Sequence, residues 1–129
     1  MEDRYNFRGK RVDNGKWVEG YYVGPMGCIG EKYSVSRIYF ASGPCVKVLP
    51  ETVGQCTDLK DWNHELIFEG DIIKISDKQI ADVRWNPEFG SWDMRQKGYP
   101  SYPLQQYIGH SEVIGNIYDN PELLGGDES

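Results

Sequence analysis

A chain of 129 residues is long enough to bury one core without disulfides or a metal ion, and a single domain is expected at this length. Its mean hydropathy of −0.62 excludes a body embedded in the membrane, and its charged N-terminus lacks the apolar stretch of a secretory signal, so we expect a cytoplasmic protein. The formal net charge of −6 opposes nonspecific attachment to nucleic acid, which requires lysine and arginine to neutralise phosphates.

The charges are unevenly distributed along the chain. Residues 4–16 carry five lysines and arginines against one acid, Asp13, whereas residues 112–128 carry five acids and no base. Such asymmetry favours neighbouring chains that meet by opposite charge as much as it favours a nucleic acid.

The composition predicts an all-β fold. Glycine is abundant, with 15 residues, and aromatic residues reach 13%, which combines turn formers with strand formers. No stretch of about 11 residues or more repeats apolar side chains at helical spacing without an interrupting glycine or proline. We therefore expect short strands, many turns and minimal helix near the C-terminus.

The N-terminal part is expected to be rich in hairpins. Asn14-Gly15 is a dipeptide that accepts positive φ at both central positions of a tight turn, which predicts a hairpin over about residues 7–23. Residues 32–41 and 45–49 have the alternation and β-branched content of two further strands.

The C-terminal part is expected to be barrel-like. Residues 65–75 read as strand on both sides of Gly70, where we expect the chain to kink or bulge. Residues 81–85 and 91–95 alternate apolar and polar side chains and are expected to pair as a hairpin across a five-residue loop, with their two tryptophans in the core.

The last third of the chain is more irregular. Residues 97–107 hold two prolines among tyrosines, which favours an extended surface segment that is mobile or clasps a partner. Residues 112–118 predict a last strand, and residues 120–124 predict a single helical turn capped by Asn120. The tail at 125–129 is expected to fray.

Five carboxylates crowd into the stretch TDLKDWNHELIFEGDIIKI: Asp58, Asp61, Glu65, Glu69 and Asp71. General acid–base chemistry would need one of a pair to lie in an apolar environment. We interpret them instead as turn and solvent-face groups, with Asp71 hydrogen-bonded to backbone amides where the chain bends. The stretch therefore supplies no predicted catalytic residue.

The histidines and cysteines do not form a motif. His64 and His110 lie in predicted turns, and neither is spaced to a cysteine or a second histidine as a metal ligand would be. The three cysteines, Cys28, Cys45 and Cys56, form no Cys-x-x-Cys pair and no even-numbered disulfide set, so we expect reduced thiols. A catalytic Cys–His pair would meet in space rather than along the chain, and no local signature supports one. We expect neither a metal nor a cofactor.

One aromatic and cationic edge is a candidate binding site. Its residues are Trp92, Arg95, Lys97, Tyr99 and Tyr102. Tyrosines in a segment broken by prolines serve well at interfaces because their rings carry a polar tip. With cations beside them, they suit either stacking on bases or contact with a protein.

Four segments of the chain have distinctive sequences and follow one another in a characteristic order: GKWVEGYYV, PETVGQCTDLKDWNHELIFEGDIIKI, ADVRWNPEFGSWDM and EVIGNIYDNPELL. Together they resemble the segments of YopX-like proteins encoded by bacteriophages and prophages. The resemblance implies one YopX-like domain over residues 1–129, with two small β subdomains at about 1–50 and 51–124. It also implies a bacterial cytoplasmic setting and a capacity for self-association, and it supplies no catalytic residue. In the YopX-like proteins that the chain resembles, the turn that corresponds to the one after Asp61 commonly reads Asn-Gly. This chain has Asn63-His64 there, which argues against a two-residue type I′ turn.

We therefore expect a non-enzymatic phage or prophage accessory protein that acts as a protein-interaction or self-assembly module and has no membrane partner. The alternative is a nucleic-acid-associated β-barrel module, which the net charge disfavours. A basic groove beside exposed aromatics would favour nucleic acid, and a large apolar interface would favour assembly. A third interpretation, an enzyme that uses acidic or cysteine residues, has no motif to support it.

Overall fold

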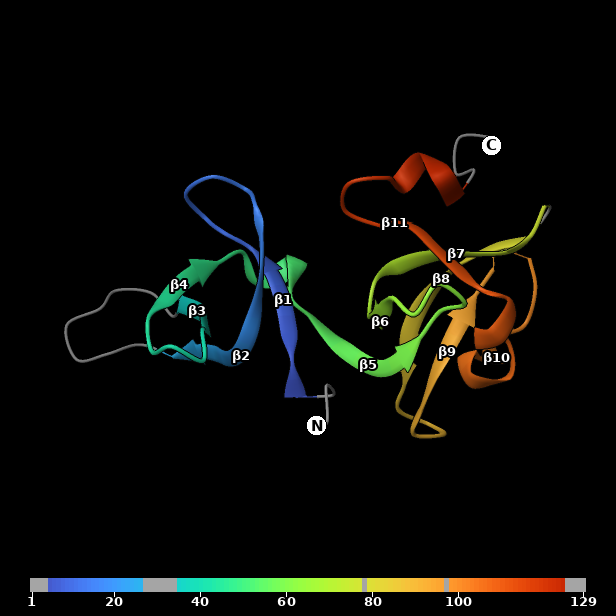
Figure 1. Cartoon of the computed structure of the whole chain (residues 1–129), viewed down its shortest axis with the longest axis horizontal. Coiled ribbons are helices and arrows are strands. Elements are labelled where there is room, and N and C mark those ends of the chain that lie inside the picture. Colours follow the sequence, from blue (N-terminus) through green and yellow to red (C-terminus); the bar gives the residue numbers. More distant parts are fainter. Residues whose placement is uncertain (1–4, 27–34, 78, 97, 125–129) are drawn as a thin grey trace. The chain divides into compact units, whose positions relative to one another are not determined.

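The computed structural model describes residues 5–26, 35–77, 79–96 and 98–124. These residues form antiparallel strands joined by turns and short 3₁₀ segments, so the predicted all-β fold is confirmed (Figure 1). The chain divides into two compact units, residues 1–56 and 57–129. The boundary falls within a strand, a few residues after the position predicted for it. The predicted frayed tail lies outside the described residues.

The first unit contains the strands β1 to β5 and one 3₁₀ segment, η2. Their bounds are β1 Phe7–Lys10, β2 Trp17–Met26, β3 Val35–Tyr39, β4 Cys45–Val48, η2 Pro50–Thr52 and β5 Gly54–Lys60, of which the last residues pass into the second unit. The second unit contains β6 to β11. Their bounds are β6 Leu66–Phe68, β7 Asp71–Ser76, β8 Gln79–Asn86, β9 Ser91–Arg95, β10 Tyr102–Pro103, η3 Leu104–Gln106, η4 Ile108–His110, β11 Glu112–Asn116 and η5 Pro121–Leu124.

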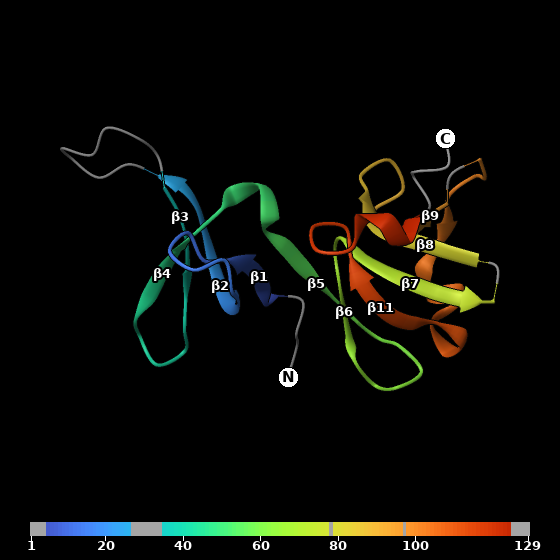
Figure 2. The ribbon, with the colours of Figure 1, turned by 90° about the horizontal axis from the view of Figure 1, so that it is seen from above.

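Both units repeat the same strand order. In the first unit the order is β4-β3-β2-β1-β5, with η2 between β4 and β5. In the second it is β10-β9-β8-β7-β11, with η3 and η4 between β10 and β11. Each unit is thus a meander of four strands whose fifth strand returns, through a 3₁₀ segment, to pair with the first. Figure 2 shows this return in the second unit, where β11 lies beside β7.

The first predicted hairpin is confirmed, but its turn differs from the prediction. β1 pairs with β2 up to Lys10 opposite Trp17, so the loop spans residues 11–16 rather than two residues. Only Gly15 of the Asn14-Gly15 dipeptide has positive φ, at 72°, while the Asn14 side chain accepts a hydrogen bond from the Lys16 amide. A side-chain hydrogen bond from Arg11 in this loop holds the pKa of Asp13 below its usual value.

The edge of β4 is covered by the chain that follows β1. Arg11 forms a bridge to Val48, the Val12 amide donates to the Lys47 carbonyl at 3.0 Å, and the Leu49 amide donates to the Lys10 carbonyl at 2.8 Å. These bonds curl the first sheet into a partly closed barrel and cover the end of the β4 edge, which other chains could otherwise extend.

Close approach between β2 and β3 requires a glycine at position 20. A Cβ on Gly20 would clash with the Tyr39 carbonyl oxygen and lie 2.9 Å from Cγ2 of Ile38. Ile38 and Val48 are fully buried, and the Phe7 and Tyr22 rings lie 5.4 Å apart between their centroids. The core of the first unit therefore depends on the absence of a side chain at Gly20 in β2.

The core of the second unit joins six buried side chains: Ile67, Ile73, Ala81, Val83, Met94 and Leu104. Leu104 belongs to the tyrosine-proline segment, and β10 pairs Pro103 with Asp93 at the edge of the sheet. Proline suits an edge strand because it has no backbone amide to donate inward. The described part of the segment is thus an edge strand followed by a 3₁₀ segment, as expected for an irregular surface segment, and a buried leucine anchors it to the core. Its clasping of a partner stays a prediction.

The predicted pairing of β8 with β9 is confirmed, with Val83 opposite Met94. β8 extends to Asn86, so the loop has four residues instead of the expected five. Trp92 is half-buried and packs against the core, but Trp85 is 46% exposed, which corrects its predicted core position. Trp85 lies near the end of the hairpin, where the core side chains no longer reach.

The predicted turn at the C-terminal end is present as η5. The cap differs from the prediction, because Oδ1 of Asn120 accepts a hydrogen bond from the Asn116 amide at 3.2 Å and so bonds backward along the chain. The side chain lies close to Gly115, where a Cβ would be 2.6 Å from the same oxygen. Asn120 therefore fastens η5 to the end of β11.

Candidate functional site

Asp61 is a buried structural carboxylate. Its Oδ1 accepts hydrogen bonds from the amides of Asn63 and Glu65, both at 2.9 Å, and its Oδ2 accepts one from Val113 at 2.9 Å. The prediction of a turn residue is confirmed, whereas its expected position on the solvent face is wrong, since only 3% of Asp61 is exposed. One carboxylate thus orders the turn and fastens it to β11.

The turn after Asp61 has three residues. The His64 amide donates to the Asp61 carbonyl and the Asp61 amide donates to the Glu65 carbonyl, both at 2.9 Å. His64 has φ of 66°, the left-handed conformation that follows the turn in three-residue hairpin loops. The expected departure from a two-residue turn is confirmed, and an imidazole occupies a position that favours glycine.

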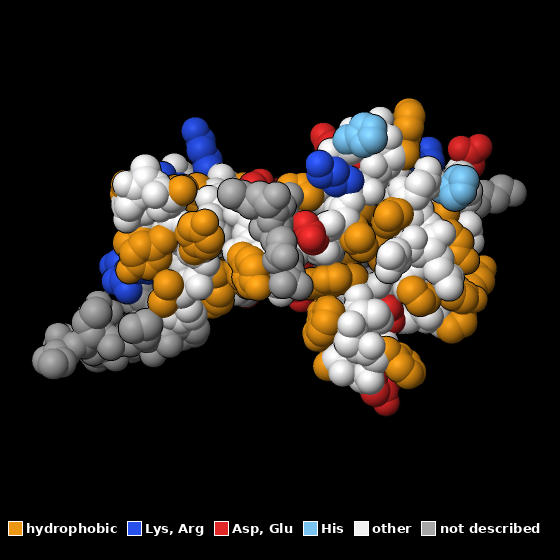
Figure 3. Space-filling model, turned by 60° about the horizontal axis from the view of Figure 1, so that its bottom comes forward, with side chains coloured by type: hydrophobic (Ala, Val, Ile, Leu, Met, Phe, Trp, Pro, Cys, Tyr) orange, Lys and Arg blue, Asp and Glu red, His pale blue; other side chains and the backbone are white. Residues whose placement is uncertain are grey.

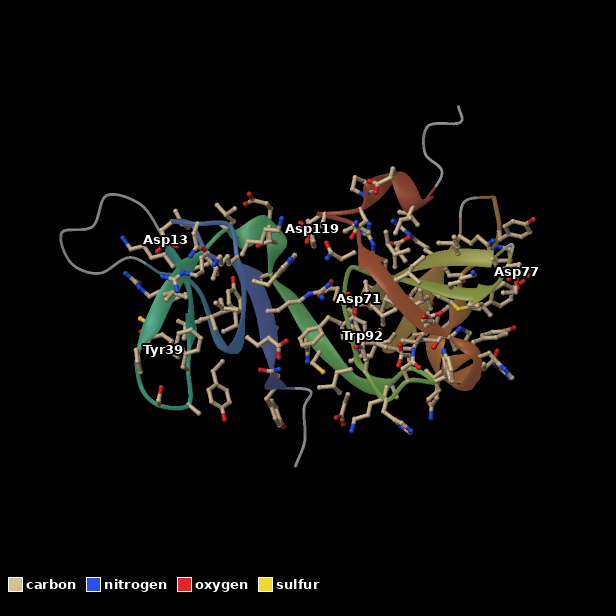
Figure 4. All side chains as sticks on the ribbon, turned by 45° about the horizontal axis from the view of Figure 1, so that its top comes forward. Asp13, Tyr39, Asp71, Asp77, Trp92 and Asp119 are labelled. Atoms are coloured by element: carbon tan, nitrogen blue, oxygen red, sulfur yellow. The ribbon has the colours of Figure 1, made fainter. Side chains whose placement is uncertain are left out.

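Asp71 has the role predicted from the sequence. It is 2% exposed, and Oδ2 accepts a hydrogen bond from the Phe68 amide at 2.7 Å across Gly70, whose φ is 88° (Figure 4). The Gly70 amide and carbonyl also bond to β8 and to Ile117. The Asp71 carboxylate therefore supports the bend between β6 and β7.

The predicted aromatic and cationic edge is divided between two faces of β9. Trp92 points to the core side and forms an edge-to-face pair with Trp85, with ring centroids 5.1 Å apart. Arg95, at an odd separation from Trp92, lies opposite Asp82 on the other face, with Nη2 3.8 Å from the carboxylate. Lys97 lies outside the described residues.

The two predicted tyrosines are exposed. Tyr99 is 62% exposed and Tyr102 is 41% exposed, and the Tyr102 ring packs edge-on to Tyr107. Tyr102 pairs with Met94, so it shares the face of Trp92 rather than that of Arg95. The structure therefore brings Trp92 and Tyr102 to one face and does not add Arg95 to them.

The other face of β8 and β9 carries opposed charges in register. Asp82 lies opposite Arg95 and Arg84 lies opposite Asp93. Arg84 also donates to Asp82 from Nε at 2.6 Å. A hollow of about 280 Å³ lies there, and its lining residues are Glu69, Arg84, Trp85, Asn86, Pro87, Asp93, Arg95 and Ser101. Two acids balance the two arginines, so this hollow is not the basic groove that the nucleic-acid alternative requires.

A second surface lies in the first unit, on the side of β1 to β4 away from the core. Directly paired residues of antiparallel strands share a face, and the register places these side chains together. We name this set the outer face: Arg8, Lys10, Trp17, Glu19, Tyr21, Val23, Arg37, Tyr39, Cys45 and Lys47. Figure 3 shows hydrophobic side chains gathered on the first unit, with lysine or arginine side chains at their margins.

Aromatic and cationic groups alternate across the outer face. Tyr21 and Tyr39 are directly opposite each other and are 56% and 38% exposed. At one side of the face, the Arg8 guanidinium and the Lys10 ammonium lie over the Trp17 ring, 4.8 Å and 5.4 Å from its centroid. These distances are those of cation–π contacts.

Within the described ranges, no group of three or more histidine, cysteine or acidic side chains is placed to hold a metal ion. The same part of the chain contains no helix that is long and apolar enough to cross a bilayer.

The family described as YopX protein matches residues 6–125, nearly the whole chain. The chain belongs to the YopX protein family. This confirms the resemblance that the four sequence segments indicated.

A solved structure has a similar fold to this YopX-family chain. It is the crystal structure of protein EF1440 from Enterococcus faecalis, with a TM-score of 0.55 and 21% identity, covering 92% of this chain and 96% of that chain. At this identity the likeness establishes the fold alone. Among curated proteins, none matches the chain.

The outer face of this YopX-family chain could not be assigned from the sequence. Trp17, Tyr21 and Val23 alternate with Val18 and Tyr22, so both faces of β2 look apolar. The only signal was the excess of lysine and arginine near the N-terminus, and it did not show which strand face these cations share.

Proposed function

We propose that this YopX-family protein is a non-enzymatic binding module whose partner is a protein, including further copies of the same chain. Phe89 carries the proposal, because 78% of this large apolar side chain is exposed at the tip of the β8–β9 hairpin. Aromatic side chains are enriched at protein interfaces and often contribute most of the binding energy.

The hairpin loop presents Phe89 in an ordered conformation. The Asn86 side chain accepts a hydrogen bond from the Glu88 amide at 3.0 Å, and the Asn86 carbonyl accepts one from Gly90 at 2.8 Å. Gly90 has φ of 63°, which closes the loop without steric cost. A loop that is already ordered loses little conformational entropy when it binds.

Trp85 extends the apolar surface at the base of this loop. It is 46% exposed and is braced by the Trp92 ring. The β8–β9 hairpin therefore offers a partner two exposed aromatic side chains, a residue type found at interface centres.

The non-enzymatic part of the proposal is supported by how the buried acids are used. Asp61 and Asp71 accept backbone hydrogen bonds, and Asp82 and Asp93 are paired with side chains of the same hairpin. The bacterial cytoplasm and a phage or prophage origin belong to the same proposal and are supported by the resemblance to phage-encoded proteins.

The test is the mass of the protein in solution, measured by sedimentation over a range of concentrations. We expect the wild type to associate and Phe89→Ser to reduce association at least tenfold, because the ring lies in the contact. Trp62→Ser is the matched control, since Trp62 is an exposed aromatic, at 58%, in a different loop. High salt should weaken association only slightly, because the contact is apolar.

If the wild type is monomeric, the proposed partner is a different protein. Quantitative pull-downs from infected bacteria should then lose a partner with Phe89→Ser and keep it with Trp62→Ser. If neither association nor any captured protein depends on Phe89, the proposal is wrong.

A further inference from the structure

We propose that the outer face of the first unit is a binding site for single-stranded nucleic acid. This inference is independent of the protein contact proposed at Phe89. It rests on the alternation of exposed aromatic rings and cations across β1 to β4, together with the opposite charges of the two units.

Tyr21 and Tyr39 provide a stacking platform. They lie opposite each other on neighbouring strands, so their backbones are about 5 Å apart and their rings can contact bases that follow one another along a strand. With exposures of 56% and 38%, both rings have surface that a base can cover. Stacking of this kind tolerates any sequence because every base has a π-face.

Cations flank the platform on both sides. On one side of the tyrosines, Arg37 on β3 is directly opposite Lys47 on β4, and Lys47 is exposed. On the other side, Arg8 and Lys10 are held over the Trp17 ring by the contacts described above. A strand whose bases lie on the tyrosines would place its phosphates near one or both of these rows.

Among the described residues that define the outer face, four are cations and one is an acid. The acid is Glu19, opposite Arg8, and its carboxylate accepts a hydrogen bond from the Asn6 amide group at 3.1 Å. This excess of positive charge matches a phosphate backbone, in contrast to the balanced charges in the hollow of the second unit.

The net charges of the two units also differ in sign, and the first unit, which carries the outer face, is the positive one. Residues 1–56 carry eight lysines and arginines and six acids, a net charge of +2, whereas residues 57–129 carry six and fourteen, a net charge of −8. The negative net charge of the whole chain therefore comes from the second unit. A polyanion is repelled there and attracted only to the first unit.

Single strands are favoured over duplexes on this face. The aromatic rings lie in the middle of the sheet, and only unpaired bases can stack on them. A duplex keeps its bases stacked inside and can reach only the cations. The same cations would also attract an acidic protein, so the experiment includes an acidic polypeptide as a competitor.

The experiment is fluorescence anisotropy with the full chain and a short labelled oligothymidylate, its uridylate equivalent and a duplex of equal length. We expect both single strands to bind at about 50 mM salt and to weaken steeply towards 200 mM. Tyr21→Ala combined with Tyr39→Ala should weaken binding at least tenfold, because two stacked bases are lost. Lys47→Gln should reduce the salt slope by about one.

Two controls separate this site from the contact at Phe89. Phe89→Ser and Arg95→Gln should leave nucleic-acid affinity unchanged, and the double tyrosine variant should keep the association and circular dichroism of the wild type. Polyglutamate should compete poorly at equal charge. The proposal is overturned if the single strands do not bind, if the tyrosine variant binds as tightly as the wild type, or if the duplex or polyglutamate binds equally well.

Discussion

His64 shows how a single side chain can oppose the turn it occupies. Its φ of 66° lies in the left-handed region, where a Cβ crowds the following carbonyl and glycine meets no such penalty. The turn is kept in place by the hydrogen bonds that Asp61 accepts from Asn63, Glu65 and Val113. The cost at position 64 is thus offset by one buried carboxylate.

Replacing this histidine tests that balance. We expect His64→Gly to raise the free energy of unfolding by about 0.5–1 kcal/mol, because the strain is relieved by more than the added flexibility of the unfolded chain costs. Urea denaturation followed by tryptophan fluorescence measures the change. His110→Gly is the control: His110 is also exposed but has no positive φ, so stability should stay the same or fall. A less stable His64→Gly variant would show that the imidazole contributes a favourable contact.

The two units repeat one order of strands, and the sequence predicted most of these strands without revealing the repeat. β1, β2, β8 and β9 carry clear alternation and were predicted with their partners. β10 has two residues, Tyr102 and Pro103, and no pattern can be read from so few. Which face of β2 is buried depends on the position of Gly20 against β3, a long-range pairing that local alternation does not contain.

The site was harder to predict than the fold for the same reason. Trp92 and Arg95 are close in sequence, but the pleat of β9 separates them, whereas Tyr21 and Tyr39 are far apart in sequence and become neighbours through strand pairing. The roles of Asp61 and Asp71 were predictable in part because hydrogen bonds in turns are local.

Gly20 provides a test of the strand packing. Gly20→Ala should lower the free energy of unfolding by about 1–3 kcal/mol, because the new methyl group overlaps the Tyr39 carbonyl and presses on Ile38. Gly24→Ala, on the same strand, is the matched control. Its Cβ would lie 3.7 Å from the Tyr22 hydroxyl, an ordinary contact, so stability should change by less than about 0.5 kcal/mol. Equal effects of the two substitutions would contradict the close approach of β2 and β3.

Separate cores in one chain predict separate unfolding steps. Trp17 is in the first unit and the other three tryptophans are in the second, so Trp17→Phe leaves tryptophan fluorescence, excited selectively, that reports on the second unit alone. In that background, Gly20→Ala should shift part of the urea transition seen by circular dichroism and leave the fluorescence transition unchanged. If both signals shift together, the units unfold cooperatively.

β5 makes it difficult to excise either unit by cutting the gene at the boundary between them. Gly54 and Gln55 complete the first sheet beside β1, while Thr57, immediately beyond the boundary, donates its hydroxyl hydrogen to the Ile67 carbonyl. A cut after Cys56 would divide β5, leaving residues 54–56 with the first unit and residues 57–60 with the second, which contains β6, the neighbour of β5 in the sheet. Expression fragments of either half should therefore include all of Gly54–Lys60, and domain shuffling at this junction requires that the strand be duplicated.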